Sequence, residues 1–351
     1  MVFKHLTVFG DSLSDNGNLY KYSFHMVPKS PPYFKGHFSN GPIWFEGVKN
    51  AYWKSDLNAT TDVSSVGDYA VGGAGAIFSD KEVLPYTLWS ELTDYLIRDN
   101  GTNIDSTLFV VWIGANNYVR GPENVEELTT DVVAGIEKGI NRLLKHGATM
   151  ITIGNLPDLG VMPESERYGT KDLMHELTLI HNEKLFQMYQ SLQQSHPNVH
   201  FIYMDVFALF NDALASPSAY GLSDMEHPCY EGGFFFSAQL RGLMGNALES
   251  QPTVSDATLK AYMLKKSASQ SNRFSAKTAD AYLGNTVLRE AILNGYYADN
   301  KKHQLITAAD GDSSCTGYLF WDHLHPTTFV HQHIAKLFID TVKEAGIVPA
   351  P

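Results

Sequence analysis

Four short apolar runs along the chain are typical of buried β-strands bounded by turn residues, and they span residues 6–9, 108–113, 150–153 and 199–204. Between these runs, apolar residues recur at the spacing of one helical face. Three such faces are formed by Val132, Ile136, Ile140 and Leu143; by Leu173, Leu177 and Ile180; and by Val330, Ile334, Leu337, Phe338 and Val342. Strands that alternate with helices predict an α/β fold, a three-layer α/β/α sandwich around a mostly parallel central sheet.

This alternation breaks between about residues 211 and 312, where the pattern shows no convincing buried strand. The region holds three consecutive phenylalanines at 234–236, a polar stretch at 265–277 and a helix-like face of Leu283, Val287, Ala291 and Ile292. We interpret it as a mostly helical insertion near the carboxyl edge of the sheet, within a single domain that spans residues 1–351. Ordinary sandwich helices separated by very short strands are the alternative.

Composition and charge limit the kinds of molecule that this protein is expected to bind. The 351 residues are 44% hydrophobic and carry a formal net charge of −12, as expected of a packed acidic protein. No basic block interrupts the acidity, so nucleic acid is not an expected partner. Anionic lipid headgroups would repel such a surface, so any contact with a membrane surface would be hydrophobic and transient. No apolar run approaches the ~20 residues of a transmembrane helix.

The tetrapeptide Gly10-Asp11-Ser12-Leu13 directly follows the first predicted strand. A strand that breaks at a glycine delivers the next side chains to the carboxyl edge of the sheet, where ligands bind in open α/β folds. Ser12 is therefore a candidate nucleophile, which needs a base, an orienting carboxylate and oxyanion donors.

His325 is the candidate base. Pro326 disfavours helical geometry at His325, and Thr327 or Thr328 can cap the amphipathic helix that follows, which places His325 on a turn. Asp322, three residues earlier, can accept a hydrogen bond from the imidazole. His323 is a rival base on the same turn, and a purely local turn cap by Asp322 is the alternative interpretation.

Two segments offer oxyanion donors. Residues 68–75 form a glycine-rich turn whose backbone N–H groups can approach a ligand closely. Asn116 follows the second predicted strand and emerges at the same sheet edge as Ser12, although an asparagine after a strand is often only a turn residue. A second Gly-Asp-Ser at 311–313 follows polar residues rather than a strand, so we do not expect a nucleophile there. The G-x-S-x-G elbow, the P-loop and common metal-ligand spacings are absent from the sequence.

Taken together, these segments resemble the GDSL, or SGNH, family of lipolytic hydrolases, whose four blocks carry Ser, Gly, Asn and His in that order. The matching blocks are residues 10–18, 70–74, 114–118 and 322–326. Residues 38–44, 155–160 and 320–322 look like the bacterial branch of phospholipases A, lysophospholipases and glycerophospholipid:cholesterol acyltransferases. The resemblance spans nearly the whole chain except the insertion, and implies a flavodoxin-like sandwich.

Carried over residue by residue, the resemblance implies Ser12 as nucleophile, His325 as base and Asp322 as its orienting group. The implied oxyanion hole comprises the backbone N–H groups of Ser12 and Gly73 and the side chain of Asn116, with Gly72 the less favoured glycine. Asn117 departs from the family, which usually has Asp there, and this departure puts local hydrogen bonding in doubt.

The resemblance implies acyl transfer through an acyl-serine without a metal or other cofactor. We expect a lysophospholipase A or phospholipase A acting on lysophospholipid or phospholipid. An acyltransferase with a sterol acceptor is the close alternative. A carbohydrate O-acetylesterase and a non-catalytic lipid-binding or cytolytic protein are further ones. The phenylalanines at 234–236 are candidates for an acyl-chain wall or a lid, or else for core.

Cys229 and Cys315 flank the predicted insertion. The presence of only two cysteines leaves two possibilities open, a pair of free thiols or one disulfide in an exported protein. We expect the disulfide, and with it a secreted or periplasmic bacterial protein in its mature form. Because the first strand leaves no room for a signal peptide, a cytoplasmic protein is the alternative.

Overall fold

The fold is that of a computed structural model, which describes residues 1–23, 25, 27–53, 66–78, 86–98, 103–118, 124–231, 255–268, 276–284, 289, 292 and 315–350. Five parallel strands form the central sheet in the order β3-β2-β4-β5-β6. Their bounds are Val66–Asp68 for β3, His5–Gly10 for β2, Thr107–Trp112 for β4, Met150–Gly154 for β5 and His200–Met204 for β6. The α/β prediction is confirmed, and each predicted strand lies within one residue of its observed bounds.

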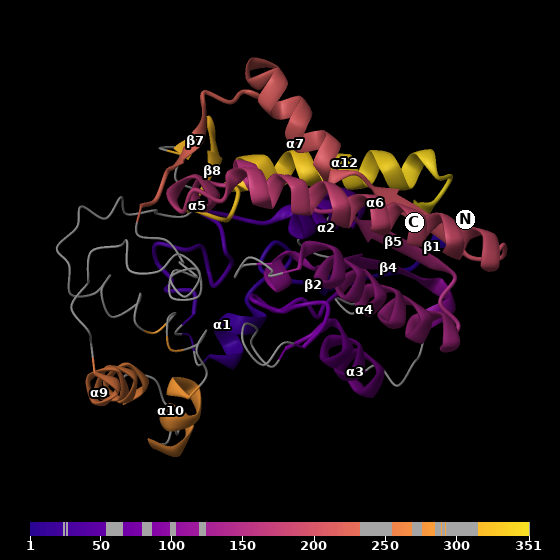
Figure 1. The fold of residues 1–351 in the computed structure, drawn as a ribbon. Coiled ribbons are helices and arrows are strands. Elements are labelled where there is room, and N and C mark those ends of the chain that lie inside the picture. Colours follow the sequence, from indigo (N-terminus) through magenta and orange to yellow (C-terminus); the bar gives the residue numbers. More distant parts are fainter. Residues whose placement is uncertain are drawn as a thin grey trace.

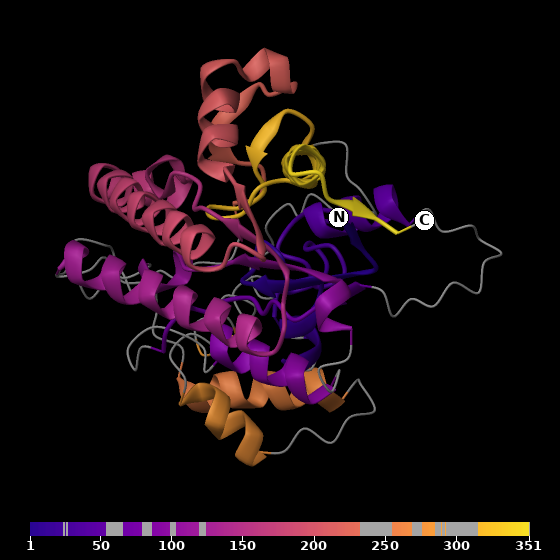
Figure 2. The ribbon, with the colours of Figure 1, turned by 90° about the vertical axis from the view of Figure 1, so that its right-hand side faces the viewer.

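Alternation of side chains along the strands divides the core into two layers. Phe9 and Val111 face one layer, whereas their neighbours Val8 and Val110 face the other. Helices α3 (Leu88–Arg98), α4 (Val125–Lys145) and α6 (Lys171–Ser195) cover the first face, and α2 (Trp44–Tyr52), α7 (Val206–Ala215) and α12 (Thr328–Glu344) cover the second. Figure 1 labels these helices, and Figure 2 shows the sheet between the two sets. This is the predicted three-layer sandwich.

The predicted helical faces are largely the buried ones. All four residues of the face on α4 are buried, as are four of the five on α12, where Leu337 is half-buried. On α6 the predicted face is displaced, since Leu173 and Ile180 are only half-buried and the buried stripe continues from Leu177 instead. The buried stripe of this helix includes a polar residue, His181. The buried face therefore cannot be recognised from the spacing of apolar residues alone.

Short elements complete the fold. Strand β1 (Val2–Phe3) pairs with β9 (Val348–Pro349), and β7 (Asp224–Pro228) pairs with β8 (Tyr318–Phe320). The remaining short helices are α1 (Asn18–Tyr22), α5 (Pro163–Arg167), η2 (Ile104–Ser106), η3 (Ala115–Tyr118), η4 (Leu159–Val161) and η5 (Pro217–Tyr220). Strand β3 escaped prediction because its three residues are only half-buried and include a glycine.

Beyond the end of α7 and η5, the region predicted as an insertion contains the described helices α9 (Asp256–Ala268) and α10 (Ala276–Leu283), which contact each other. They share a small apolar cluster of Leu259, Met263, Ala279, Leu283 and Ile292, separate from both layers of the main core. The region also contains β7, a mostly exposed strand whose polar residues give no strand signal. The phenylalanines at 234–236, Val287, Ala291 and the second Gly-Asp-Ser lie outside the described residues. The insertion therefore stays a prediction.

A disulfide joins Cys229 to Cys315, which are 86 positions apart. The bond joins the end of β7 to the chain that enters β8. The backbone N–H of Cys229 also donates to the carbonyl of Phe320, the last residue of β8. Among the helices that the structure describes, none is both long enough and apolar enough to cross a membrane.

Candidate active site

Ser12 lies just beyond β2, where the strand order changes direction. From β2 the chain passes to β3 on one side and then crosses to β4 on the other side of β2, and ligands bind at such a switch point. A side chain at Gly10 would meet the carbonyl of Trp112 at 2.6 Å, so only glycine allows the two strands to end this close together. The backbone then turns, with the N–H of Ser14 donating to the carbonyl of Asp11 at 2.9 Å. Ser12 is thereby presented at the carboxyl edge.

Ser12, His325 and Asp322 form a continuous hydrogen-bonded chain, although Ser12 and His325 are 313 positions apart. The Ser12 hydroxyl is 2.8 Å from Nε2 of His325. The other ring nitrogen, Nδ1, lies 2.8 and 2.9 Å from the two carboxylate oxygens of Asp322. With Nδ1–H donating to Asp322, Nε2 is left as the acceptor for the Ser12 hydroxyl.

The Asp322 carboxylate is buried but saturated with donors. Besides the His325 ring, it accepts from the backbone N–H groups of Leu324 and His325 at 2.8 and 2.7 Å and from the Tyr33 hydroxyl. Burial alone would raise the pKa of Asp322, but the charge of His325 and the hydrogen bonds from His325 and Tyr33 outweigh it and hold that pKa below its usual range. The carboxylate therefore stays ionised beside the imidazole.

The turn that carries Asp322 and His325 is fixed from several sides. The N–H of Trp321 donates to the carbonyl of His325 at 2.8 Å, which closes the turn. Ser39 donates its hydroxyl to the carbonyl of Pro326 at 2.9 Å. Thr327 caps α12, as its side chain accepts from the N–H of Val330. The segment at 38–44 that the resemblance singled out thus contacts the turn that carries His325.

The rival base has a different environment. Nε2 of His323 lies 3.5 Å from the carboxylate of Glu231, and His323 is not among the residues that line the pocket beside Ser12. The structure brings His325, and not His323, to Ser12.

Three predicted oxyanion donors keep unused N–H groups. Within the described residues, the backbone N–H groups of Ser12 and Gly73 have no hydrogen-bond partner. The side chain of Asn116 donates one N–H to the carbonyl of Ala74 at 3.0 Å, which leaves its second N–H unused. The N–H of Gly72, in contrast, is occupied by the Asp15 carboxylate at 2.7 Å. Gly73 adopts a φ of 80°, a conformation that favours glycine. Ser12 and Asn116 line the same pocket, and Gly73 lies outside its lining.

Two buried carboxyl groups that the sequence interpretation missed hold these segments together. Asp15 accepts from the N–H of Leu19 as well as that of Gly72, and so connects the serine turn to the glycine turn. Glu91 on α3 accepts from the N–H of Gly10 at 3.0 Å and of Val71 at 3.3 Å. Burial raises the pKa of both groups. The burial of Glu91 could have been predicted from the sequence, because Glu91 lies on the same helical face as the apolar residues Leu88, Leu92 and Tyr95.

Asn117, the departure from the family pattern, has a defined structural role. Its side-chain oxygen accepts from the N–H of Ala76 at 2.7 Å, and its amide nitrogen donates to the carbonyl of Ile77 at 3.0 Å. An aspartate could not make the second bond while ionised. The asparagine therefore anchors residues 76–77 with both halves of its amide.

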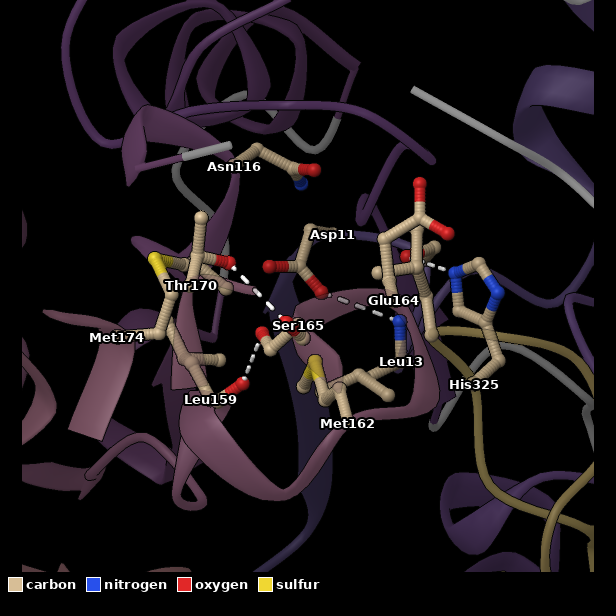
Figure 3. A pocket seen from close by; sticks show the side chains of 13 residues that line it. Asp11, Leu13, Asn116, Leu159, Met162, Glu164, Ser165, Thr170, Met174 and His325 are labelled. Atoms are coloured by element: carbon tan, nitrogen blue, oxygen red, sulfur yellow. Dashed lines mark hydrogen bonds between the residues drawn. The ribbon is translucent and has the colours of Figure 1, made fainter. Parts of the chain in front are cut away.

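A pocket opens beside Ser12 and is drawn in Figure 3. Its apolar lining comes from Leu13, Ala115, Leu159, Met162, Met174 and Leu324, and its polar lining from Asp11, Ser12, Asn116, Glu164, Ser165, Thr170 and His325. Burial raises the pKa of Asp11 to about 6 and that of Glu164 to about 8. An apolar cavity against a serine-histidine pair suits a substrate with a hydrocarbon part.

Comparison with known proteins gives a consistent picture. The family model described as GDSL-like lipase/acylhydrolase matches residues 6–338. The phosphatidylcholine-sterol acyltransferase of Aeromonas hydrophila is 28% identical over 334 residues, which cover 95% of this chain and 88% of that protein. The thermolabile hemolysin of Vibrio parahaemolyticus is 26% identical over 231 residues, 64% of this chain and 51% of that protein.

Among solved structures, phospholipase A1 of Streptomyces albidoflavus aligns with a TM-score of 0.34 at 13% identity, over 64% of this chain and 88% of that one. This similarity is too low to carry an argument.

Proposed function

The chain belongs to the GDSL-like lipase/acylhydrolase family, and from this premise we propose that it cleaves fatty acyl esters of lysophospholipids or phospholipids through an acyl-serine intermediate. The observation that carries the proposal is the Ser12–His325–Asp322 chain, with 2.8 Å between the Ser12 hydroxyl and the imidazole, at the mouth of a pocket rich in Leu and Met.

The proposed reaction is a two-step acyl transfer. Ser12 Oγ attacks the ester carbonyl while Nε2 of His325 takes the hydroxyl proton. The resulting oxyanion is stabilised by the unused N–H groups of Ser12, Gly73 and Asn116, and one such donor is typically worth about 3–4 kcal/mol in the transition state. His325 then gives its proton to the leaving alcohol, and the same histidine activates the water that hydrolyses the acyl-serine. Asp322 holds the imidazole in the required tautomer throughout.

Transfer to a sterol or another alcohol is a second candidate, because the Aeromonas relative covers 95% of this chain and is named as a sterol acyltransferase. Both activities share the acyl-serine and differ only in whether water or an alcohol accepts the acyl group. A carbohydrate O-acetylesterase is disfavoured because its small acyl group does not need the apolar lining of this pocket. A non-catalytic lipid-binding or cytolytic protein is disfavoured because such a protein needs no hydrogen-bonded triad.

The partners and location follow from the same proposal. A lipid substrate implies transient contact with a membrane surface, and the acidic surface makes that contact hydrophobic rather than electrostatic. The disulfide between Cys229 and Cys315 favours a secreted or periplasmic location, because such bonds persist in oxidising compartments.

Product analysis with Ser12→Ala tests the proposal. Purified wild type is incubated with phosphatidylcholine, lysophosphatidylcholine and a short-chain ester, each with and without cholesterol. We expect fatty acid release, with cholesteryl ester as a further product if an alcohol also accepts the acyl group. Ser12→Ala should lower kcat by about 10⁴-fold or more while lipid binding persists. Ser313→Ala, in the second Gly-Asp-Ser, is the matched control and should keep full activity. Undiminished turnover by Ser12→Ala would contradict the triad assignment.

A further inference from the structure

Glu164, the second residue of α5, is a buried carboxyl group that the proposed reaction does not use. It is 3% exposed and lines the pocket that contains Ser12 and His325. Neither carboxyl oxygen has a hydrogen-bond partner within the described residues, although both are shielded from solvent. Each of the other polar side chains that line the pocket makes at least one hydrogen bond (Asp11, Ser12, Asn116, Ser165, Thr170 and His325). A buried polar group without protein partners is costly, so Glu164 calls for a partner from outside the chain, a ligand or an ordered water.

The start of α5, which carries Glu164, is attached to the turn that carries His325. The backbone N–H of Glu164 donates to the carbonyl of His323, in that turn, at 3.0 Å. The side chains of Glu164 and His325 line the same pocket, which is drawn in Figure 3. In the proposed reaction, His325 delivers a proton to the departing alcohol. Because Glu164 and His325 line the same pocket, we expect the alcohol part of the ester on the side of Glu164.

The charged surroundings favour a protonated Glu164. No ion pair to its carboxyl group exists in the described part of the chain. Burial raises its pKa to about 8, the charge of Asp322 acts in the same direction, and Arg167 opposes both. Burial lowers the pKa of the neighbouring His323, so this side chain supplies no fixed positive charge. Asp11, another titratable group of the pocket lining, is itself an acid. At neutral pH the group is thus a carboxylic acid, with one O–H to donate.

The lining also decides which ligand group this acid suits. No Phe, Tyr or Trp ring is present among the described residues of the pocket, so a cage for a quaternary ammonium headgroup is missing there. A hydroxyl group, which can accept the acid's hydrogen bond and donate to its carbonyl oxygen, matches a neutral carboxyl on both counts. Two flexible methionines in the lining, Met162 and Met174, allow the wall to adjust around such a ligand.

We propose that Glu164 is a specificity-determining residue that binds the free hydroxyl group next to the scissile ester of a monoacyl glycerolipid. The inference rests on the proposed function and narrows its substrate class to lipids with one acyl chain and an adjacent hydroxyl, such as lysophospholipids. A diacyl lipid has an ester at that position, which can accept a hydrogen bond from the acid but cannot donate one to its carbonyl oxygen.

The test compares lysophosphatidylcholine with its 2-deoxy analogue, which has the same chain and headgroup but lacks the hydroxyl. We expect wild type to prefer the hydroxyl substrate at least tenfold in kcat/KM, because a site built to bond a hydroxyl discriminates against its absence. Glu164→Met should bring the ratio of the two kcat/KM values close to one. Glu164→Gln keeps an N–H donor and a carbonyl, and should retain most of the preference. Glu166→Gln, on the exposed side of the same helix, is the matched control and should leave the ratio at the wild-type value.

The ratio distinguishes recognition from a structural role, since loss of folded protein lowers both kcat/KM values equally. An unchanged ratio in Glu164→Met, or a wild type that does not discriminate, overturns the inference. Turnover of p-nitrophenyl butyrate by wild type and its loss in Ser12→Ala report separately on the proposed function. If turnover of that ester does not depend on Ser12, the proposed function fails; if it does and the ratio is unmoved, only the role of Glu164 fails.

Discussion

Two carboxyl groups are buried in the same site, one in the turn before α12 and one at the start of α5, and their surroundings give them opposite properties. Asp322 is 0% exposed and Glu164 is 3% exposed, so burial does not distinguish them. Asp322 accepts hydrogen bonds from the His325 ring, from two backbone N–H groups and from Tyr33. Glu164 accepts none within the described residues. The pKa is lowered at Asp322 and raised to about 8 at Glu164.

The comparison teaches that the charge of His325 together with its donors, rather than depth, lowers the pKa at Asp322, whereas backbone donors alone leave the pKa of the buried Asp15 raised. Charge at Asp322 is useful because an imidazolium forms beside it during the proposed reaction. A negative charge on Glu164 would repel the developing oxyanion. A neutral Glu164 avoids this repulsion and still offers a polar contact.

The largest expected effect comes from removing the charge of Asp322. Asp322→Asn preserves the shape of the turn but supports the wrong imidazole tautomer, and we expect kcat to fall about 10³–10⁴-fold. Steady-state hydrolysis of a p-nitrophenyl ester measures it. Asp224→Asn is a matched control, because Asp224 also pairs with a histidine three residues later, His227, but at the surface. Equal losses in the two variants would show that the Asp322 carboxylate has no special role.

The sequence predicted the scaffold better than the wall of the pocket. The buried strands have a local signature, because every residue of β4 and β5 is buried and apolar runs result. Ser12, Asn116, Asp322 and His325 lie in short blocks whose order identifies the family.

The partners of those residues could not be predicted in the same way. Tyr33 reaches Asp322 across 289 positions, and such a pairing leaves no local pattern. Glu164 follows a proline and precedes Ser165 and Glu166, a polar run typical of an exposed helix start. The start of α5 is attached to the turn that carries His325, and Glu164 is buried there. Tertiary contacts, and not propensity, created these features.

The two acids should also affect stability with opposite sign. The pKa of Glu164 rises from the ordinary 4.5 to about 8 on folding, so between these values the folded state binds more protons than the unfolded state. The free energy of unfolding therefore falls as pH rises through this window. Glu164→Gln lacks this dependence. One pKa unit equals about 1.4 kcal/mol. The free energy of unfolding of Glu164→Gln, relative to that of wild type, should therefore increase by roughly 2–4 kcal/mol between pH 5 and pH 9.

Urea unfolding of wild type and Glu164→Gln at several pH values measures the difference. Glu166→Gln, whose side chain is exposed and paired with Lys171, should follow wild type across the range. Asp322, with its lowered pKa, stabilises the folded state above its ordinary range and loses that contribution in acid. A pH-independent difference for Glu164→Gln would mean that Glu164 is ionised in the folded protein.

The smallest expected effect tests whether the donors around Asp322 act individually. Tyr33→Phe removes one hydrogen bond to Oδ2 of Asp322, while the ring keeps its edge-on packing against Trp321 at 5.9 Å between centroids. Three donors to the carboxylate remain, so the turn stays folded. We expect kcat to fall about tenfold, equivalent to ~1.4 kcal/mol of lost transition-state stabilisation, with KM little changed. Hydrolysis of the same p-nitrophenyl ester measures it. A decrease as large as that of Asp322→Asn would show that Tyr33 alone keeps Asp322 ionised, and wild-type kcat would show that the other donors suffice.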